Sequence, residues 1–361
     1  MYIKQISALQ PGERLAKPIY TASGRILINA RVELTAMMIR RLASLGIQRV
    51  YVSDPRTDDI VFEDSVSNET KIRATQMVSE TFSDMLEARR WNRSISLAKL
   101  GMRFRGVFED ILFDLQGTKE LLLQLTGIYT ADKYLYTHSV NVGIYSAALG
   151  IALGLDRSQL LELGIGAMLH DIGMILLDSE LLEKERRLTK EELEEIKQHT
   201  ILGYEFLRQQ TDIPLLSAHC SLQHHERIDG SGYPRGLRDK EIHTYGKIIG
   251  ITDTYTALIA KRPYRNGYLP HEAMDILYGS LGKYDASMLQ TFRNHIVLFP
   301  IGTIVSLSTG ETGVVVDVNA KYPDRPIIRI LKNGNGEDIS SYEIDMSSHL
   351  SILISKCESA L

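Results

Sequence analysis

The distribution of histidines is the feature of this sequence that most constrains its fold. Six of the ten histidines lie between positions 138 and 225, and the acids Asp171 and Asp253 lie within or just after this stretch. The groups at 138, 170, 199, 224–225 and 253 are separated by 32, 29, 25 and 28 residues. A helix of three to five turns with a loop has about this length, so successive helices can each bring one ligand group to a shared centre. The spacing therefore predicts an α-helical core around a polar centre.

The residues near these histidines indicate that the side chains point inward. Thr189 and Glu192 form a capping box, which predicts the start of a helix that runs to Leu207. On that helix His199 lies on the same stripe as Phe206, so both are expected to face the core. One buried histidine is usually an ordinary core residue. Five on inward faces with two acids form a polar cluster that is costly to bury, and metal ions usually compensate such clusters.

The types of these side chains favour a catalytic metal site. Imidazole and carboxylate groups without thiolates are typical of Fe, Mn, Zn or Ni at catalytic sites, whereas structural zinc sites usually contain cysteines. Five histidines and two aspartates exceed what one tetrahedral ion needs, so two ions that share a bridging carboxylate fit the count better. Two ions about 3.5–4 Å apart can hold both the attacking and the leaving oxygen in phosphoester cleavage.

Composition excludes several other classes of protein. The 361 residues include 41 basic and 45 acidic side chains, and a net charge of −4 argues against a binder of duplex DNA. Two cysteines cannot make a disulfide framework and favour a reducing compartment, and residues 1–5 do not resemble a secretory signal. The uncharged run 134–155 is long enough to span a membrane, but its polar side chains favour a buried helix. We therefore expect a cytoplasmic protein with no membrane span.

The chain divides into four segments by pattern. Residues 1–53 predict a small α/β module with a hairpin at 16–28, a helix capped by Thr35 and a closing strand at 49–52. This module is expected to bind a protein signalling partner, or alternatively to act as a sensor. Residues 54–127 predict an acidic linker and a helical connector that pairs across a homodimer. Residues 128–298 predict the helical core, and residues 299–361 a small β-rich module with strands near 303–307, 313–316 and 327–331.

Several motifs together resemble one family. The segments that carry the resemblance are Leu169-His170-Asp171-Ile172-Gly173, the run from His224-His225-Glu226 to Gly232-Tyr233-Pro234, Asp132 to Ser139, and Arg262-Pro263-Tyr264-Arg265. In order and spacing, about residues 128–275 resemble the HD-GYP domain of the HD phosphohydrolase superfamily. The resemblance implies a mainly α fold, with an all-α HD-GYP catalytic domain between the two small modules.

The resemblance also implies an activity and a ligand set. HD-GYP domains are cyclic di-GMP phosphodiesterases, which open this cyclic dinucleotide to linear pGpG and sometimes continue to GMP, with a hydroxide shared by two metal ions. By resemblance, Asp171 and His170 are catalytic and the ions are two divalent metals, usually Fe or Mn. One metal would be held by His138, His170, Asp171 and Asp253, and the other by His199, His224, His225 and the bridging Asp171. Some members hold a third metal through a glutamate at the position of Tyr134, so we expect two metals here.

The remaining motif residues are expected to bind substrate. By resemblance, Arg262 and Arg265 bind the substrate phosphates, Gly232 lets the loop bend, and Tyr233 projects toward the substrate. Met174 is a departure, because the family frequently has a lysine there that places a cation beside the scissile phosphate. This difference supports one alternative, a weak or inactive receptor for cyclic di-GMP. A separate alternative is an HD hydrolase that acts on another nucleotide phosphoester.

Three further residues have roles that the sequence does not decide. Glu226 and Asp229 either orient imidazoles or are ordinary polar residues at a helix end. Arg186 is atypical, because the family often has glycine at its position.

Overall fold

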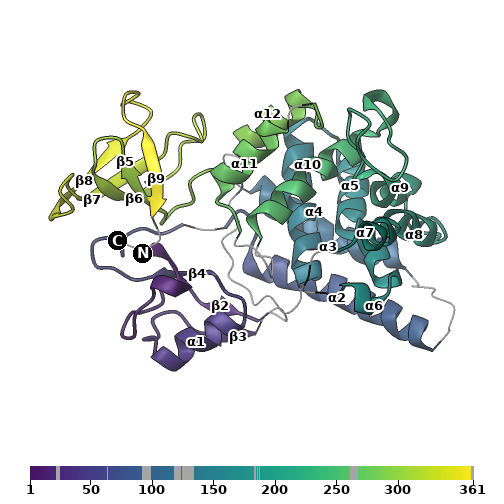
Figure 1. Ribbon diagram of the computed structural model, residues 1–361, viewed down its shortest axis with the longest axis horizontal. Coiled ribbons are helices and arrows are strands. Elements are labelled where there is room, and N and C mark those ends of the chain that lie inside the picture. The colour runs from purple at the N-terminus through teal and green to yellow at the C-terminus, as the bar shows by residue number, and fades with distance from the viewer. Residues whose placement is uncertain are drawn as a thin grey trace. The chain divides into compact units, whose positions relative to one another are not determined.

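The computed structural model describes residues 1–21, 25–62, 64–91, 99–117, 123, 134–182, 184, 186, 188–260, 267–280 and 282–358. The chain forms two compact units. One comprises Met1–Ser65, Leu122–Lys133 and Arg293–Leu361, and the other comprises Val66–Leu121 and Tyr134–Phe292. The second unit is built of helices, and the first holds the strands (Figure 1). The predicted mainly α fold with a small β-rich C-terminal module is confirmed.

The helical unit contains all the elements that position the predicted site. In chain order they are α2 (Asn68–Arg90), α3 (Leu100–Gln116), α4 (Tyr134–Ala152), α5 (Arg157–Leu169), the 3₁₀ helix η3 (Ile172–Leu176), α6 (Ser179–Leu182), α7 (Lys190–Lys197), α8 (His199–Leu207), α9 (Leu215–Gln223), the 3₁₀ helix η4 (Asp239–Glu241), α10 (Thr244–Ile259), α11 (Pro270–Gly279) and α12 (Ala286–Asn294).

Side-chain caps fix where several of these helices begin. Ser67 caps α2 by accepting a hydrogen bond from the Thr70 backbone N–H. The predicted capping box of α7 is confirmed, because Thr189 and Glu192 each accept a hydrogen bond from the other's backbone N–H.

The centre of the unit is a stack of buried helices. Helix α4 packs against α5 and α10, α5 packs against α9, and α8 packs against η3 and α9 (Figure 1). The uncharged run predicted as a buried helix forms α4, whose apolar side chains from Val140 to Leu149 are almost fully buried. One stretch, Arg157–Leu176, has the length and hydropathy of a membrane span, but 72% of its window is buried within the unit. A core helix passes the same test, so this stretch is weak support for a membrane span.

The helix predicted to run from Thr189 to Leu207 is interrupted. Helix α7 ends at Lys197, and α8 begins at His199. The Thr200 hydroxyl donates a hydrogen bond of 2.9 Å to the Lys197 carbonyl oxygen at this break. The prediction of one continuous helix was wrong at this point.

The other unit combines both ends of the chain. Its elements are β1 (Tyr2–Gln5), the 3₁₀ helix η1 (Ile6–Ala8), β2 (Ile19–Tyr20), β3 (Ile26–Ile28), α1 (Ala36–Ser44), β4 (Arg49–Val52), β5 (Ile304–Leu307), β6 (Thr312–Asp317), β7 (Ile327–Lys332), β8 (Asp338–Asp345) and β9 (Ile354–Glu358). Strand β1 pairs with β4, and the C-terminal strands form one antiparallel sheet in the order β8-β7-β6-β5-β9. The predicted hairpin is the β2–β3 pair, and Thr35 caps α1 as expected. Strands β8 and β9 were not predicted.

Two features of this organisation differ from the predicted segments. The N-terminal and C-terminal modules share one hydrophobic core, in which Leu15 and Val50 join Ile304 and Val314. Helices α2 and α3, predicted as a connector, are part of the helical unit and bury large side chains such as Phe82 there. Sequence patterns identify each apolar face but do not show which other segment covers it.

Candidate metal centre

The structure brings the seven predicted ligand residues together at one place in the helical unit. His138 lies on α4, and His170 and Asp171 follow the end of α5. His199 begins α8, His224 and His225 follow α9, and Asp253 lies on α10. Each is therefore at, or next to, the end of a packed helix, or on a buried helix face. Their polar atoms form two overlapping groups that share Asp171.

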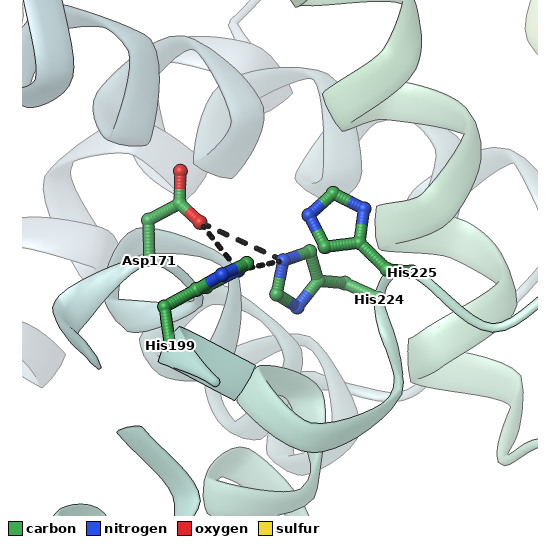
Figure 2. Close-up of side chains that lie close together, drawn as sticks. All are labelled: Asp171, His199, His224 and His225. Atoms are coloured by element: carbon green, nitrogen blue, oxygen red, sulfur yellow. Dashed lines mark hydrogen bonds and ion pairs between the residues drawn. The ribbon is translucent and has the colours of Figure 1, made fainter. Parts of the chain in front are cut away.

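The first group, here called the His199 group, consists of Asp171, His199, His224 and His225. Asp171 Oδ1 lies 3.4 Å from His199 Nε2 and 3.6 Å from His224 Nε2, and the two Nε2 atoms are 3.3 Å apart. Figure 2 shows these three side chains directed at a common point, with the His225 ring beside them.

The second group, here called the His138 group, consists of His138, His170 and Asp171. Asp171 Oδ2 lies 3.3 Å from His170 Nε2. Asp253 joins this group through one oxygen, with Oδ1 2.9 Å from His138 Nε2 and 3.9 Å from His170 Nε2. The two carboxyl oxygens of Asp171 therefore face different groups.

Backbone carbonyls hold three of the rings in one orientation. In each ring Nδ1 lies within hydrogen-bond distance of the carbonyl oxygen of the residue three positions earlier in the chain. A carbonyl can only accept, so Nδ1 carries the proton, and in the neutral ring Nε2 then has a free lone pair. The pairs are His170 with Ala167 (2.7 Å), His199 with Ile196 (2.7 Å) and His224 with Ser221 (2.9 Å).

These lone pairs face each other without a donor between them. With both Nδ1 atoms protonated, neutral His199 and His224 cannot hydrogen-bond to one another across 3.3 Å. Within the described part of the chain, buried His170 Nε2 makes no hydrogen bond, and the acidic oxygen beside it is Asp171 Oδ2 at 3.3 Å. Buried polar atoms are rarely left unpaired. Proteins orient a metal-binding imidazole by a hydrogen bond from its other ring N–H, often to a backbone carbonyl oxygen. The donor set therefore fits divalent metal ions.

The electrostatics of the site also favour cations. Burial alone would raise the pKa of Asp171 and of Asp253, but the surrounding imidazoles hold both well below the ordinary value. Burial lowers the pKa values of His199 and His225, which keeps these rings neutral. For His170 burial also acts downward, but the carboxylates of Asp171 and Asp253 outweigh it and raise the pKa to about 9. The same negative potential that attracts a proton to His170 attracts a metal ion.

Two glycines allow the close packing that places Asp171 beside His199. A Cβ on Gly173 would lie 1.9 Å from the His199 carbonyl oxygen, and one on Gly203 would lie 2.3 Å from Ser221 Oγ. Ser221 Oγ in turn donates a hydrogen bond of 2.8 Å to the His170 carbonyl oxygen. The sequence analysis did not identify Gly203 or Ser221 as supports, although both lie on the helices that it expected to carry ligands.

The loop that contains Gly232 and Tyr233 is attached directly to the His224–His225 segment. A Cβ on Gly232 would lie 2.5 Å from the His225 carbonyl oxygen, so only glycine fits. The Tyr233 backbone N–H donates to that same oxygen, and the Tyr233 ring lies 4.6 Å from the His225 ring, centre to centre. The carboxylate of buried Glu226 accepts hydrogen bonds from the N–H groups of Arg235 and Leu237, each 2.8 Å.

These contacts decide between the two expectations for the acids of this loop. Glu226 organises the loop backbone, and Asp229 accepts a hydrogen bond from the Ser231 N–H within a turn. Neither of these hydrogen bonds goes to an imidazole.

The other predicted residues have different outcomes. Arg262 and Arg265 lie outside the described residues. Met174 lines a cavity of about 490 Å³ together with Phe82 and Tyr136. Arg186 pairs with Glu192 of the α7 capping box at 2.6 Å, which gives an arginine a structural use at this position.

Comparisons with known proteins find matches for two parts of the chain. A family described as "HD domain" matches residues 123–288, and one described as "KOW domain associated with HD domain" matches residues 304–360. Cyclic di-GMP phosphodiesterases of Pseudomonas aeruginosa, Borreliella burgdorferi and Thermotoga maritima are 32%, 33% and 35% identical to this chain. They cover 58%, 56% and 54% of it. The matches span 50%, 53% and 52% of those relatives, so this chain corresponds to about half of their length.

Proposed function

We propose that the chain, whose residues 123–288 match the family described as "HD domain", is a metal-dependent phosphodiesterase that hydrolyses cyclic di-GMP to linear pGpG. The observation that carries the proposal is the set of imidazole Nε2 atoms and carboxylate oxygens that converge from separate helices, with facing lone pairs and no donor between them. The activity of the relatives named above supports the substrate.

The ligand assignment follows the two groups. His199, His224 and His225 would hold one ion, and His138, His170 and Asp253 the other, with Asp171 contributing an oxygen to each. Two divalent cations there, Fe or Mn by the resemblance, would supply a water nucleophile that is deprotonated near neutral pH and would stabilise charge on the phosphoryl oxygens.

The protein groups around the centre have three tasks in this reaction. The backbone carbonyl oxygens of Ala167, Ile196 and Ser221 accept hydrogen bonds from the Nδ1–H groups, so the imidazoles present their Nε2 lone pairs in fixed directions. Burial raises the pKa of Tyr233, so its hydroxyl remains protonated and can donate a hydrogen bond to a substrate oxygen. Arg262 and Arg265 remain candidates for phosphate binding on the strength of the family motif, since guanidinium groups bind phosphate oxygens in pairs.

The decisive experiment measures turnover and binding together. We would purify the full chain without oxygen, load it with Mn²⁺ or Fe²⁺, and follow cyclic di-GMP, pGpG and GMP by chromatography. Formation of pGpG that depends on the metal supports the proposal, and cyclic dinucleotides that contain adenine serve as competitors for the choice of substrate.

Two outcomes of this experiment would replace the proposed function with another. Tight binding of cyclic di-GMP with no product over hours would identify a receptor, for which Met174 in place of the family lysine is the supporting observation. Faster cleavage of another nucleotide would identify a different HD hydrolase.

A further inference from the structure

A lysine that the motif comparison did not select lies at the edge of the centre. Lys197 is the last residue of α7, two positions before the predicted ligand His199. Its Nζ lies 5.2 Å from the centre of the Tyr233 ring. The opposite contact of that ring is with the His225 ring, at 4.6 Å between ring centres. Tyr233 therefore connects the ammonium group to the His199 group.

The position of this lysine is well fixed. The Lys197 carbonyl oxygen accepts a hydrogen bond from the Thr200 hydroxyl at the break between α7 and α8. Just beyond, the His199 backbone packs against Gly173, the second residue after Asp171. The packing that places Asp171 therefore also places the base of the Lys197 side chain.

The ammonium group itself is only loosely held. Nζ pairs with Glu194 Oε1 at 2.6 Å, one helical turn earlier, and the Glu194 side chain is 67% exposed. Such surface pairs contribute little to stability, whereas a phosphate offers a stronger, charge-assisted contact. Lys197 is 26% exposed, so it can exchange Glu194 for a ligand at the edge of the centre with little loss.

A second cation near the loop is engaged in a different way. Arg227 donates through Nη1 to the carbonyl oxygens of His224 and Glu226, at 3.0 and 2.8 Å. Its guanidinium group thus supports the backbone that carries the ligands. Lys197, by contrast, has a partner at the surface that a ligand can replace.

We propose that Lys197 binds the phosphate of the cyclic dinucleotide that is not being cleaved. This inference rests on the proposed function, because only a substrate with two phosphodiesters presents a second phosphate while the first lies at the metal centre. Lys197 is then a substrate-binding residue whose contribution disappears with a substrate that has one phosphodiester.

The test compares two substrates in the metal-loaded full chain. Lys197→Met is expected to raise KM for cyclic di-GMP by roughly 10–100-fold, as expected for losing a hydrogen bond between charged groups. The rate with bis(p-nitrophenyl) phosphate, which has one phosphodiester, should stay within about twofold. Lys197→Arg should restore most of the affinity for cyclic di-GMP, because it keeps the charge.

Two control variants separate binding from structure. Lys184→Met removes another lysine that pairs with a glutamate of α7, Glu192 at 2.6 Å, and should leave both substrates unaffected. Glu194→Gln frees the Lys197 ammonium and should not raise KM. Melting temperature and bound metal are measured for each variant, since a folding defect would change them.

The outcomes for the two proposals differ. If wild-type protein neither binds nor cleaves cyclic di-GMP, the proposed function is wrong and this inference fails with it. If wild-type protein binds or cleaves cyclic di-GMP, the KM of Lys197→Met relative to that of wild type decides whether Lys197 binds the substrate. For a receptor without turnover, Kd replaces KM in this comparison. An unchanged KM or Kd in Lys197→Met, or an equal loss with both substrates, overturns the role of Lys197 and leaves the proposed function intact.

Discussion

The two ligand groups that share Asp171 are built differently. In the His199 group, His199 and His224 are fixed by backbone carbonyls, and their Nε2 atoms face each other at 3.3 Å. In the His138 group, His138 Nε2 and Asp253 Oδ1 already form a hydrogen bond of 2.9 Å. In the first arrangement the Nε2 lone pairs of two neutral rings face each other, whereas the second is partly satisfied by its own members.

This difference predicts unequal metal affinities. A rigid site whose lone pairs have no other partner has little to lose when a cation binds, because the orientation is already fixed. A site that must first break a buried hydrogen bond loses that interaction, roughly 1–3 kcal/mol for a bond to a charged group. We therefore expect the His199 group to bind its ion more tightly than the His138 group.

The largest effect is expected at Asp171, which both groups share. Asp171→Ala removes a carboxylate oxygen from each group, so turnover should fall to background, by more than about 1,000-fold relative to wild type. Far-UV circular dichroism should remain that of a helical protein. Asp178→Ala, which removes a nearby exposed carboxylate, is the matched control and should keep its activity. Activity retained in Asp171→Ala would remove the basis for treating the two groups as one centre.

The next largest effect tests the expected difference in metal affinity between the His199 group and the His138 group. His224→Ala should abolish binding at the tighter site, whereas His138→Ala should leave one ion bound per chain at metal concentrations where wild type holds two. Elemental analysis after dialysis at stepped Mn²⁺ concentrations measures this. Equal metal loss in the two variants would show that the two groups do not differ in affinity.

A smaller effect concerns the packing that joins the groups. Gly173→Ala places a Cβ 1.9 Å from the His199 carbonyl oxygen, so η3 and α8 must separate, and overpacking of this kind costs about 1–3 kcal/mol. Gly106→Ala is the control, because a Cβ there meets no atom within 4 Å in helix α3, and it should stabilise the protein by roughly 0.5–1 kcal/mol. Chemical denaturation gives both values, and a neutral Gly173→Ala would refute this packing argument.

The smallest effect separates the metal ligands from the loop beside them. Glu226→Gln replaces one acceptor oxygen by an NH₂ group, so one of the two hydrogen bonds to the loop backbone is lost and the other is no longer charge-assisted. KM should therefore rise a few-fold while bound metal stays unchanged. The paired measurement is KM with metal content on the same preparation. A loss of metal instead would mean that Glu226 supports the ligands themselves.

Sequence reasoning predicted several helices and strands well, for a physical reason. Helical periodicity, caps and apolar runs are local properties, so the cap of α7 by Thr189, the buried helix α4 and the strands β5, β6 and β7 could all be read from short segments. The convergence of the histidines was a hypothesis from spacing alone, and the structure brings the five histidines and two aspartates together.

The features that were missed depend on contacts between distant segments. Neither the common core of Leu15 with Ile304 nor the approach of Gly203 to Ser221 leaves a periodic signal in the sequence. The break at Gln198 has no signal in the apolar pattern of its segment, and Lys197 becomes notable only once the Tyr233 ring lies beside it. Such details are set by tertiary packing, which overrides local preference.

The most direct test of the central claim is the number of metal ions that the wild-type chain binds at saturation. Protein purified without oxygen is stripped with chelator, titrated with Mn²⁺ and analysed by isothermal calorimetry with elemental analysis of the end point. The account predicts two ions per chain in two resolvable steps, the tighter one lost in His224→Ala. A chain that binds no ion, or one whose binding is unaffected by the loss of His224 and Asp171, would contradict it.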